Sequence, residues 1–563
     1  MKKTTKKISA AALALIMGAT AFTGCSGSTN STPGGTDSAA STSGGAATGS
    51  QKTMSSNENV KSAVDNVSVA EDYKDIKVDT KLKFMAWYDI QEASPAVELF
   101  KTLYGTPKNK PEGYESVADE NVFVNVKVSN YNNRYLDLAK LVQSDESPDT
   151  FPFETSNYPY GIYQNLFQTI DGVVDTNTED WVDYKPIIDK FNWGGKVYTP
   201  IVDVNPATLL WYRKSIIEEN GFDDPWELFE KGEWTWSKCI EMARKFTDPD
   251  NAKYAFDGYG LDHAFIATTG KPLIGLESGK LVSNLYDANI EKCMDMLRTF
   301  DDTQEQLRYP REIENNWTPS YNEWADGNTL FIEDGTWRYE ETWRKFKKKN
   351  KWEDDEINFV PFPQMDGADT YYQEMKQDAY MFVSGSKNAD GYKAWIYANL
   401  LSSKDEEVKK AGRQQSIDEF DWNETLLDRL DKLKDPATFE SVFEFKNGIG
   451  PDIADSTNGE NAVGHLTSDV IMGGNSFTTV REENKGVIEA RIKEFTLLFP
   501  KPKINTDIMP TAKAVGISAC RKSLVFDVLL LYHSALTMIM ATDVLFVGQH
   551  FSGSLFEWVH LSI

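Results

Sequence analysis

Ten residues with aromatic or polar side chains are candidates for binding chemistry, because they lie at predicted strand ends or at crossovers between strands. Aromatic rings can stack on the flat C–H faces of a sugar, and carboxylates, amides and guanidinium groups can hydrogen-bond its hydroxyls. The aromatic candidates are Trp87, Tyr158, Trp211, Tyr212 and Trp337. The polar candidates are Glu154, Asn157, Asp203, Arg338 and Asp378. This combination favours a carbohydrate-binding site, although each aromatic residue could instead belong to a core.

Some of these positions are better placed than others. Trp87, Glu154, Tyr158 and Trp337 each follow an apolar strand, where side chains reach the edge of a sheet. Asp203 precedes Asn205-Pro206, a break between two β-prone runs that is typical of a hinge, and Asp378 could equally be a solvated strand start. In contrast, Trp234, Trp236 and Trp395 have helical surroundings and are expected to pack in the interior.

Other chemistry has little support in the sequence. The body of the chain contains only His263 and His465, which are far apart and lack metal-ligand spacing. No phosphate-binding Gly-rich loop and no Gly-x-Ser-x-Gly motif is present. We therefore expect no catalytic residue, no metal and no cofactor. Cys239 and Cys293 could pair, but buried free thiols are the more common outcome.

Composition narrows the class of protein. The 563 residues include 59 Lys and Arg against 86 Asp and Glu, which gives a formal charge of −27. This charge argues against a general nucleic-acid-binding protein, whose affinity depends on clustered positive charge. With 40% hydrophobic residues the chain can bury a large core, and four Cys exclude a disulfide-built scaffold.

The candidates at the start of the body require alternating strands and helices to position them. LKFMAWY predicts a strand, and Val97, Leu99, Phe100 and Leu103 predict the helix after it. VFVNVKV alternates as a half-buried strand does, a helical pattern follows through Val142, and DTFPFET is a short apolar strand. This β-α-β-α-β order predicts a sheet with helical crossovers, in which ligands collect at the carboxyl ends of the strands.

Four segments, taken in order, resemble a known family. They are SPDTFPFE, LLWYRKSIIEENGF, EWTWSKCIEMARKF and DGNTLFIEDGTW. Together they are similar to the family 1, sugar-type extracellular solute-binding proteins of bacterial ABC importers. The resemblance implies an α/β, two-lobe periplasmic-binding-protein-like fold (type II), with hinge strands and a ligand cleft between the lobes.

The N-terminus has the pattern of an exported protein. MKKTTKK precedes an apolar run from Ile8 to Phe22, and Phe22-Thr23-Gly24-Cys25 resembles a bacterial lipobox, with Phe22 where Leu is usual. We expect residues 1–24 to be a lipoprotein signal peptide, and residues 25–70 to be a lipid-anchored Cys25 with a flexible tether. A plain signal peptide with an incidental Cys25 is the alternative. The lipoprotein interpretation places the protein on the extracellular face of the bacterial cell membrane.

The remaining chain is divided by the resemblance and by composition. Residues 71–203 are expected to form the first part of lobe 1, 204–340 lobe 2, and 341–495 the return to lobe 1 with C-terminal helices. Residues 496–563 are an atypical hydrophobic tail that we interpret as a frameshifted reading, with a true hydrophobic tail as the alternative.

Three functions are compatible with these observations. The first is a monomeric lipoprotein that captures a carbohydrate, such as an oligosaccharide, and delivers it to the transmembrane subunits of an ABC permease. The second is a cell-surface glycoside-acting enzyme, which needs two carboxylates across a sugar ring. The third is a peptide or polyelectrolyte receptor on the same fold. The order of the segments favours the first.

Overall fold

The computed structural model describes residues 58–78, 80–88, 94–105, 123–301, 305–310, 319–454 and 461–497. The predicted signal peptide, Cys25 and all but the first two residues of the predicted tail lie outside these ranges. Within them, no helix combines the length and the apolar character needed to cross a membrane.

Lobe 1 is built on a sheet of order β12-β11-β3-β1-β2. β1 (Leu82–Ala86) pairs in parallel with β2 (Phe123–Lys127) and β3 (Thr150–Pro152), which confirms the three strands predicted from apolar alternation. The predicted helices between them are α4 (Pro95–Phe100) and α5 (Arg134–Gln143). Ser94 begins α4 because its side chain accepts a hydrogen bond from Val97 N.

Lobe 2 is built on a sheet of order β10-β5-β9-β6. The strands are β10 (Ile357–Val360), β5 (Leu209–Arg213), β9 (Thr329–Asp334) and β6 (Tyr254–Gly258). All residues of β9 are buried, as expected of a strand covered on both faces. Lobe 2 was predicted to end at residue 340, and this boundary is wrong because β10 pairs with β5.

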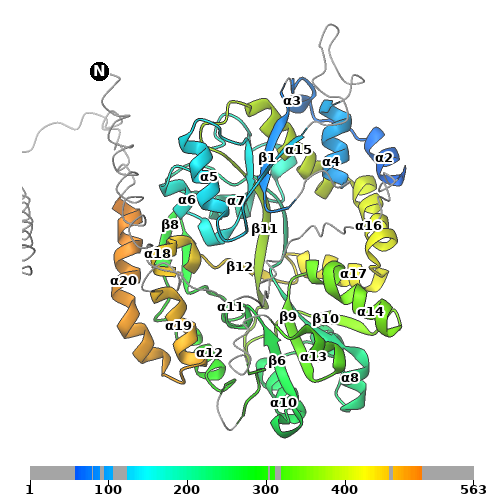
Figure 1. The fold of residues 1–563 in the computed structure, drawn as a ribbon, viewed down its shortest axis with the longest axis vertical. Coiled ribbons are helices and arrows are strands. Elements are labelled where there is room, and N and C mark those ends of the chain that lie inside the picture. Colours follow the sequence, from blue (N-terminus) through cyan, green and yellow to red (C-terminus); the bar gives the residue numbers. More distant parts are fainter. Residues whose placement is uncertain are drawn as a thin grey trace, which may run out of the picture. The chain divides into compact units, whose positions relative to one another are not determined.

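Two adjacent strands carry the chain between the lobes. β4 (Ile201–Pro206) leads through Ala207 and Thr208 into β5, and β11 (Tyr372–Phe382) follows β10 back into lobe 1. β4 and β11 pair antiparallel, and β11 extends from the lobe 1 sheet towards lobe 2 (Figure 1). The predicted hinge after Asp203 therefore coincides with a crossing, and the return to lobe 1 occurs along β11.

Helices surround both sheets. Lobe 1 carries α6 (Tyr160–Tyr163), α7 (Lys185–Lys190) and α15 (Ala389–Lys404), whose Trp395 packs edge-on against Phe123. The chain between β5 and β10 contains α8 (Lys214–Glu219), α9 (Pro225–Glu230), α10 (Trp236–Phe246), α11 (Leu261–Ala267), α12 (Ala288–Leu297), α13 (Tyr321–Asp326), α14 (Arg344–Asn350) and the β7–β8 hairpin (Ile274–Glu277, Lys280–Ser283). Trp234, Trp236 and Trp395 are buried, as predicted, and Cys239 and Cys293 are buried free thiols.

The N-terminal helices change one boundary. α2 (Glu58–Asp65) and α3 (Glu71–Lys74) precede β1, and Val60 and Val64 of α2 are buried. Because α2 lies inside the 25–70 segment predicted as a tether, the packed part of the protein begins by residue 58.

A C-terminal segment makes further contacts with both lobes. α16 (Glu406–Phe420), α17 (Glu424–Lys434) and β12 (Glu440–Val442) are followed by α18 (Pro451–Ala454), α19 (Ala462–Ile471) and α20 (Phe477–Leu497). Between β12 and α18, Phe445 N donates to Ile274 O of β7 at 3.0 Å. The backbone of Gly448 packs closely against lobe 1, since a Cβ atom at residue 448 would lie only 2.1 Å from the backbone oxygen of Tyr158.

Candidate functional site

A cleft lies between the lobes, beside the hinge strand β11. One cavity of about 520 Å³ is bordered by Trp87 and Glu154 of lobe 1 and by Trp337 of lobe 2. A second cavity, of about 340 Å³, shares Trp337 and Glu374 with the first and extends to Glu333 of β9. Because they share lining residues, we treat both as one site, the interlobe cleft.

The lobe 1 wall is aromatic. Trp87 follows β1 and is half-buried, and it packs edge-on against Tyr131, Tyr88 and Phe151 at centroid distances of 5.4, 5.6 and 6.0 Å. Arg134 of α5 lies 5.7 Å from the centroid of the Trp87 ring. These contacts fix the ring, so that it can offer a surface to a solute with little loss of side-chain entropy.

Glu154 follows β3 and is already fully engaged by its neighbours. Arg134 donates to both of its carboxylate oxygens, from Nε at 2.6 Å and from Nη2 at 3.2 Å. The hydroxyls of Tyr131 and Tyr135 donate to the same carboxylate, the first at 2.9 Å. Burial, and then the charge of Glu154, raises the pKa of Tyr131, so its hydroxyl stays protonated. Glu154 therefore positions Tyr131 and Arg134 at the rim.

The lobe 2 wall centres on Trp337, which lies just after β9. Gly335 allows its ring to fold back against the chain, since a Cβ at residue 335 would lie 1.8 Å from the ring. The Nζ atom of Lys376 lies 5.1 Å from the ring centroid. Asp334, which also borders the cleft, accepts from Arg338 Nε at 2.7 Å and from the Tyr321 hydroxyl at 2.9 Å.

The hinge strand contributes a polar row. Along β11 the more exposed positions alternate with buried ones, and the cleft-lining members of this row are Glu374, Lys376, Asp378 and Tyr380. No described residue donates a hydrogen bond to the Glu374 carboxylate or pairs with it. Burial, and then the nearby charge of Glu444, raises the pKa of Glu374 to about 8. Glu374 thus lines both cavities of the cleft with a carboxyl group that no described residue engages.

Two more titratable groups border the same region. Glu333 is 2% exposed, and burial followed by the charge of Asp334 raises its pKa to about 7. Burial lowers the pKa of His263 to about 4, although Asp262 opposes the shift, so the imidazole is neutral at pH 7. Nowhere in the described ranges do three or more His, Cys, Asp or Glu side chains form a group that could hold a metal ion.

Four of the ten predicted site residues line the cleft: Trp87, Glu154, Trp337 and Asp378. Asp378 accepts from Asn205 Nδ2 at 2.8 Å. Trp87, Glu154 and Trp337 follow their strands by one to three residues, as the rule that side chains after buried strands gather at one edge of a sheet expects, and their contact with a solute stays a prediction.

Trp211 and Tyr212 are wrong as ligand contacts. Both are 0% exposed, because β5 lies between β10 and β9 in the lobe 2 sheet. Trp211 Nε1 donates to Asp334 O at 3.0 Å, and the Tyr212 hydroxyl donates to Asp224 at 3.0 Å. Their rings form the core of lobe 2.

Three further candidates are buried beside the cleft without lining it. The Tyr158 hydroxyl donates to Phe191 O, and Asn157 is enclosed next to it. Arg338 is 9% exposed and faces Asp334 and Glu341, with its guanidinium 4.5 Å from the centroid of the Tyr321 ring. None of the three lines either cavity of the cleft, and Arg338 holds the lining residue Asp334 in place.

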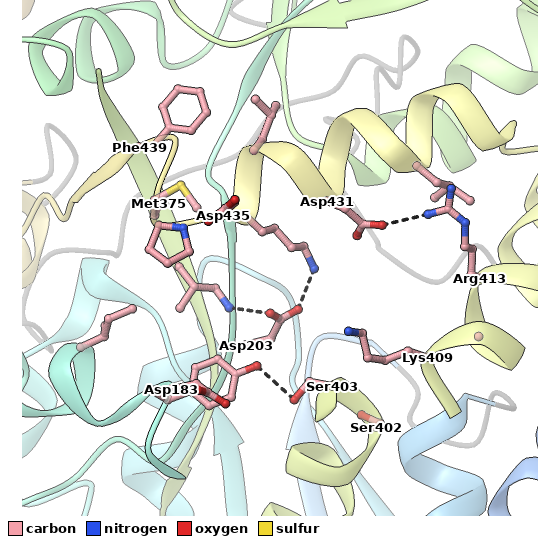
Figure 2. Close-up of a pocket in the computed structure, with 18 of the residues that line it drawn as sticks. Asp183, Asp203, Met375, Ser402, Ser403, Lys409, Arg413, Asp431, Asp435 and Phe439 are labelled. Carbon is pink, nitrogen blue, oxygen red and sulfur yellow. Dashed lines mark hydrogen bonds and ion pairs between the residues drawn. The ribbon is translucent and has the colours of Figure 1, made fainter. Parts of the chain in front are cut away.

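Asp203 borders a different cavity, of about 1180 Å³, on the side of the hinge occupied by α16 and α17. There it accepts from Lys434 Nζ at 2.8 Å and from Val204 N at 2.8 Å (Figure 2). Arg413 pairs with Asp431 across the same space. Since these charges already neutralise one another and the cavity has few aromatic residues, it suits a solute less well than the interlobe cleft does.

The sequence prediction missed several lining residues. Glu333 and Asp334 end the buried strand TLFIED, so the strand-end rule that selected Glu154 would have found them. The alternation along β11 would have placed Glu374 beside Asp378. Glu444 had no local signal, because only tertiary packing brings its segment to the cleft.

Comparison with known proteins agrees with this geometry. Residues 105–408 match the family described as bacterial extracellular solute-binding protein. Three solved structures share the fold, each covering 73–74% of this chain. An ABC transporter solute-binding protein from Thermotoga lettingae TMO, bound with alpha-D-tagatose, is 15% identical with a TM-score of 0.51 over its whole length. An ABC substrate-binding protein from Listeria monocytogenes in complex with cycloalternan is 12% identical with a TM-score of 0.51 over 99% of its length. The galacto-N-biose/lacto-N-biose I-binding protein of an ABC transporter from Bifidobacterium longum is 12% identical with a TM-score of 0.50 over 98% of its length.

The family match covers more than half of the 563 residues, and the two lobes, the paired hinge strands and the cleft between the lobes have the architecture seen in those structures. The chain therefore belongs to the bacterial extracellular solute-binding protein family and has its α/β two-lobe fold.

Proposed function

We propose that the protein captures a carbohydrate in the interlobe cleft and passes it, chemically unchanged, to an ABC permease. The observation that carries the proposal is that Trp87 of lobe 1 and Trp337 of lobe 2 border one cavity. A solute that contacts both rings is bound best when the lobes are close together. Its binding therefore favours the closed state by the difference in affinity between the two states.

Two observations support a sugar as the solute. The cleft combines aromatic rings with carboxylate, amide and hydroxyl groups, which is the set that a sugar ring requires. The first of its two cavities, of about 520 Å³, lies within the range of small-molecule sites. The three similar structures are named for binding tagatose, cycloalternan and lacto-N-biose, and all three are described as ABC substrate- or solute-binding proteins.

We also propose that Cys25 carries a lipid anchor that holds the protein on the extracellular face of the membrane. Two or more acyl chains would be sufficient for stable anchoring, whereas a single chain binds only marginally. Cys25→Ala is then expected to release the protein into the culture medium. If the variant stays in the membrane fraction, the anchor proposal fails.

A glycoside-acting enzyme is the second candidate, because Glu333 and Glu374 both have raised pKa values, as a general acid requires. Incubation with oligosaccharides followed by analysis of the products separates the two. Intact sugar supports the carrier, and cleaved sugar supports the enzyme.

The direct test is calorimetric titration of the purified protein, freed of ligand, against mono- and oligosaccharides, with peptides as the comparison. Trp337→Ala is expected to weaken sugar binding about 30-fold, or about 2 kcal/mol, as for an aromatic contact at the centre of an interface. Tyr286→Ala is the matched control, because Tyr286 is 56% exposed and lies outside the cleft. Binding of peptides alone, or equal effects of both variants, would refute the proposal.

A further inference from the structure

The interlobe cleft has an unbalanced charge. Six carboxylates border its two cavities, and the only Lys or Arg side chain among the lining residues is that of Lys376. The carboxylates are those of Glu154, Glu333, Asp334, Glu374, Asp378 and Glu444. Lys376 itself makes no ion pair with a described carboxylate and lies over the Trp337 ring.

Two of these carboxylates are neutralised by the protein. Glu154 pairs with Arg134 at 2.6 Å, and Asp334 pairs with Arg338 at 2.7 Å. Both pairs lie at the margins of the cleft, one in each lobe. The charge that remains is therefore concentrated at the hinge, between the two tryptophan walls.

Glu333, Glu374 and Glu444 have no ion pair among the described residues, while Asp378, the sixth carboxylate, accepts from Asn205 Nδ2 and lies near the charges of Lys376 and Lys434. Glu444 accepts from the backbone N–H groups of Leu273, Ile274 and Lys446, at 2.7, 3.1 and 2.8 Å, but none of these donors carries a positive charge. Glu333 accepts from Gly260 N at 2.6 Å and has the Thr208 hydroxyl beside it, and neither of these donors carries a positive charge. Glu374 accepts from none.

The surroundings of Glu374 show why this arrangement is unfavourable in the empty site. The charged groups that act on it come from three segments: Glu444 and Lys446 after β12, Glu333 at the end of β9, and Asp262 on α11. Lys446 is 3% exposed and is already paired with Asp262 at 3.3 Å. His263, on the same helix as Asp262, is neutral at pH 7 and adds no positive charge. Lys446 is the one positive charge that acts on Glu374 among the described residues, and it is shared with Asp262 and Glu444, so the three glutamates outnumber the positive charge available to them.

We propose that the solute bound in the cleft carries a positively charged amino group, as a sugar with a free amine does, and that Glu333, Glu374 and Glu444 receive it. The inference rests on the proposed function and adds the chemical class of the sugar. An ammonium group donates three hydrogen bonds and cancels charge, whereas a hydroxyl donates one and leaves the repulsion in place. The aromatic walls add to the preference, because a ring face attracts a cation.

The inference requires a particular pH dependence. An ammonium group needs ionised partners, while the pKa of Glu374 is raised to about 8 and that of Glu333 to about 7. At a pH below these pKa values, Glu374 and Glu333 of the empty site are mainly protonated, and a cationic ligand must displace these protons when it binds. Its affinity is therefore expected to rise by about tenfold per pH unit between pH 5.5 and 7 for each such proton. A neutral sugar, which can hydrogen-bond to either form, has no such requirement.

The test is calorimetric titration of the purified protein with glucosamine oligomers and with their N-acetylated counterparts, at several values between pH 5.5 and 7. We expect the free-amine oligomer to bind more tightly, to gain affinity with pH, and to release protons in buffers of different ionisation enthalpy. Glu374→Gln should weaken its binding about 30-fold, many times more than it weakens the binding of the N-acetylated oligomer. Glu407→Gln, which removes an exposed carboxylate of α16, is the matched control.

The outcomes are distinguishable. Equal or tighter binding of the N-acetylated or another neutral oligomer, without proton release, overturns the amino-group inference and leaves the carbohydrate proposal intact. Binding of peptides only overturns both. Binding of Ca²⁺ in place of the amino sugar overturns the inference as well. If Glu374→Gln does not fold, proton release by the unmodified protein still decides the question.

Discussion

Replacing Glu333 by Gln should stabilise the empty protein at alkaline pH. Glu333 is 2% exposed, and its carboxylate is kept from ionising by burial and by Asp334. Its pKa is raised above the ordinary value, so the folded state holds the proton more tightly than the unfolded state does. As the pH rises through the folded pKa, ionisation destabilises the fold. Gln keeps the acceptor for Gly260 N and cannot ionise.

The magnitude follows from the two pKa values. Burial raises the pKa of Glu333 from 4.5 to about 7, and a difference of about 2.5 is equivalent to about 3 kcal/mol at pH 9. At pH 5 the same relation gives a destabilisation by Glu333 ionisation of less than about 1 kcal/mol. For 563 residues, with an unfolding entropy of about 2.1 cal/mol/K per residue, 1 kcal/mol shifts the melting temperature by about 1 °C.

The assay is thermal unfolding of the ligand-free protein from pH 5 to pH 9, with Glu407→Gln as a surface control. The melting temperature of Glu333→Gln should exceed that of the unmodified protein by about 3 °C at pH 9 and by less than about 1 °C at pH 5. A difference that is constant with pH would show that Glu333 does not titrate in this interval, which would refute the reasoning about its environment.

Three further predictions concern single side chains. Trp211→Ala should lower the free energy of unfolding by about 3–5 kcal/mol in denaturant titration, because it leaves a cavity in the lobe 2 core; a surface-like effect would contradict that placement. Trp87→Ala should weaken sugar binding about 30-fold in calorimetry with little change in melting temperature, and unchanged affinity would exclude Trp87 from the site. Arg134→Met removes the ionic partner of Glu154 and should reduce the free energy of unfolding by about 3–5 kcal/mol in denaturant titration, and a loss below about 1 kcal/mol would show that the ion pair contributes little.

Local patterns predicted the fold well where the signal is itself local. The alternation of VFVNVKV reflects a strand with one buried face, and the helical spacing around Trp395 reflects a helix packed against it. The boundary of lobe 2 was misplaced because no local pattern in β10 or β11 shows which lobe the strand belongs to. Only their pairing, with β5 in one case and β4 in the other, assigns them to a lobe or to the hinge.

The candidate site was predicted less completely, for a related reason. The strand-end rule found Trp87, Glu154 and Trp337 because it depends on residues next to a strand. It could not tell that β5 is enclosed by neighbours on both sides, which buries Trp211. Glu444 reaches the cleft through hydrogen bonds from β7, a contact distant in sequence that no local pattern records.

The segment after β12 has a mechanical consequence for the hinge. Phe445 is hydrogen-bonded to Ile274 in β7, and Gly448 packs against Tyr158 in lobe 1, so this segment connects lobe 1 to the β7–β8 hairpin, which follows β6 of lobe 2 in the sequence, outside the two paired strands. We expect a hinge with this additional connection to open through a smaller angle than a hinge made of two strands alone. The empty receptor would then sample a narrow range of openings. Binding of a solute would therefore cost less conformational entropy. The affinity would depend more on the contacts between the solute and the cleft than on the extent of lobe closure.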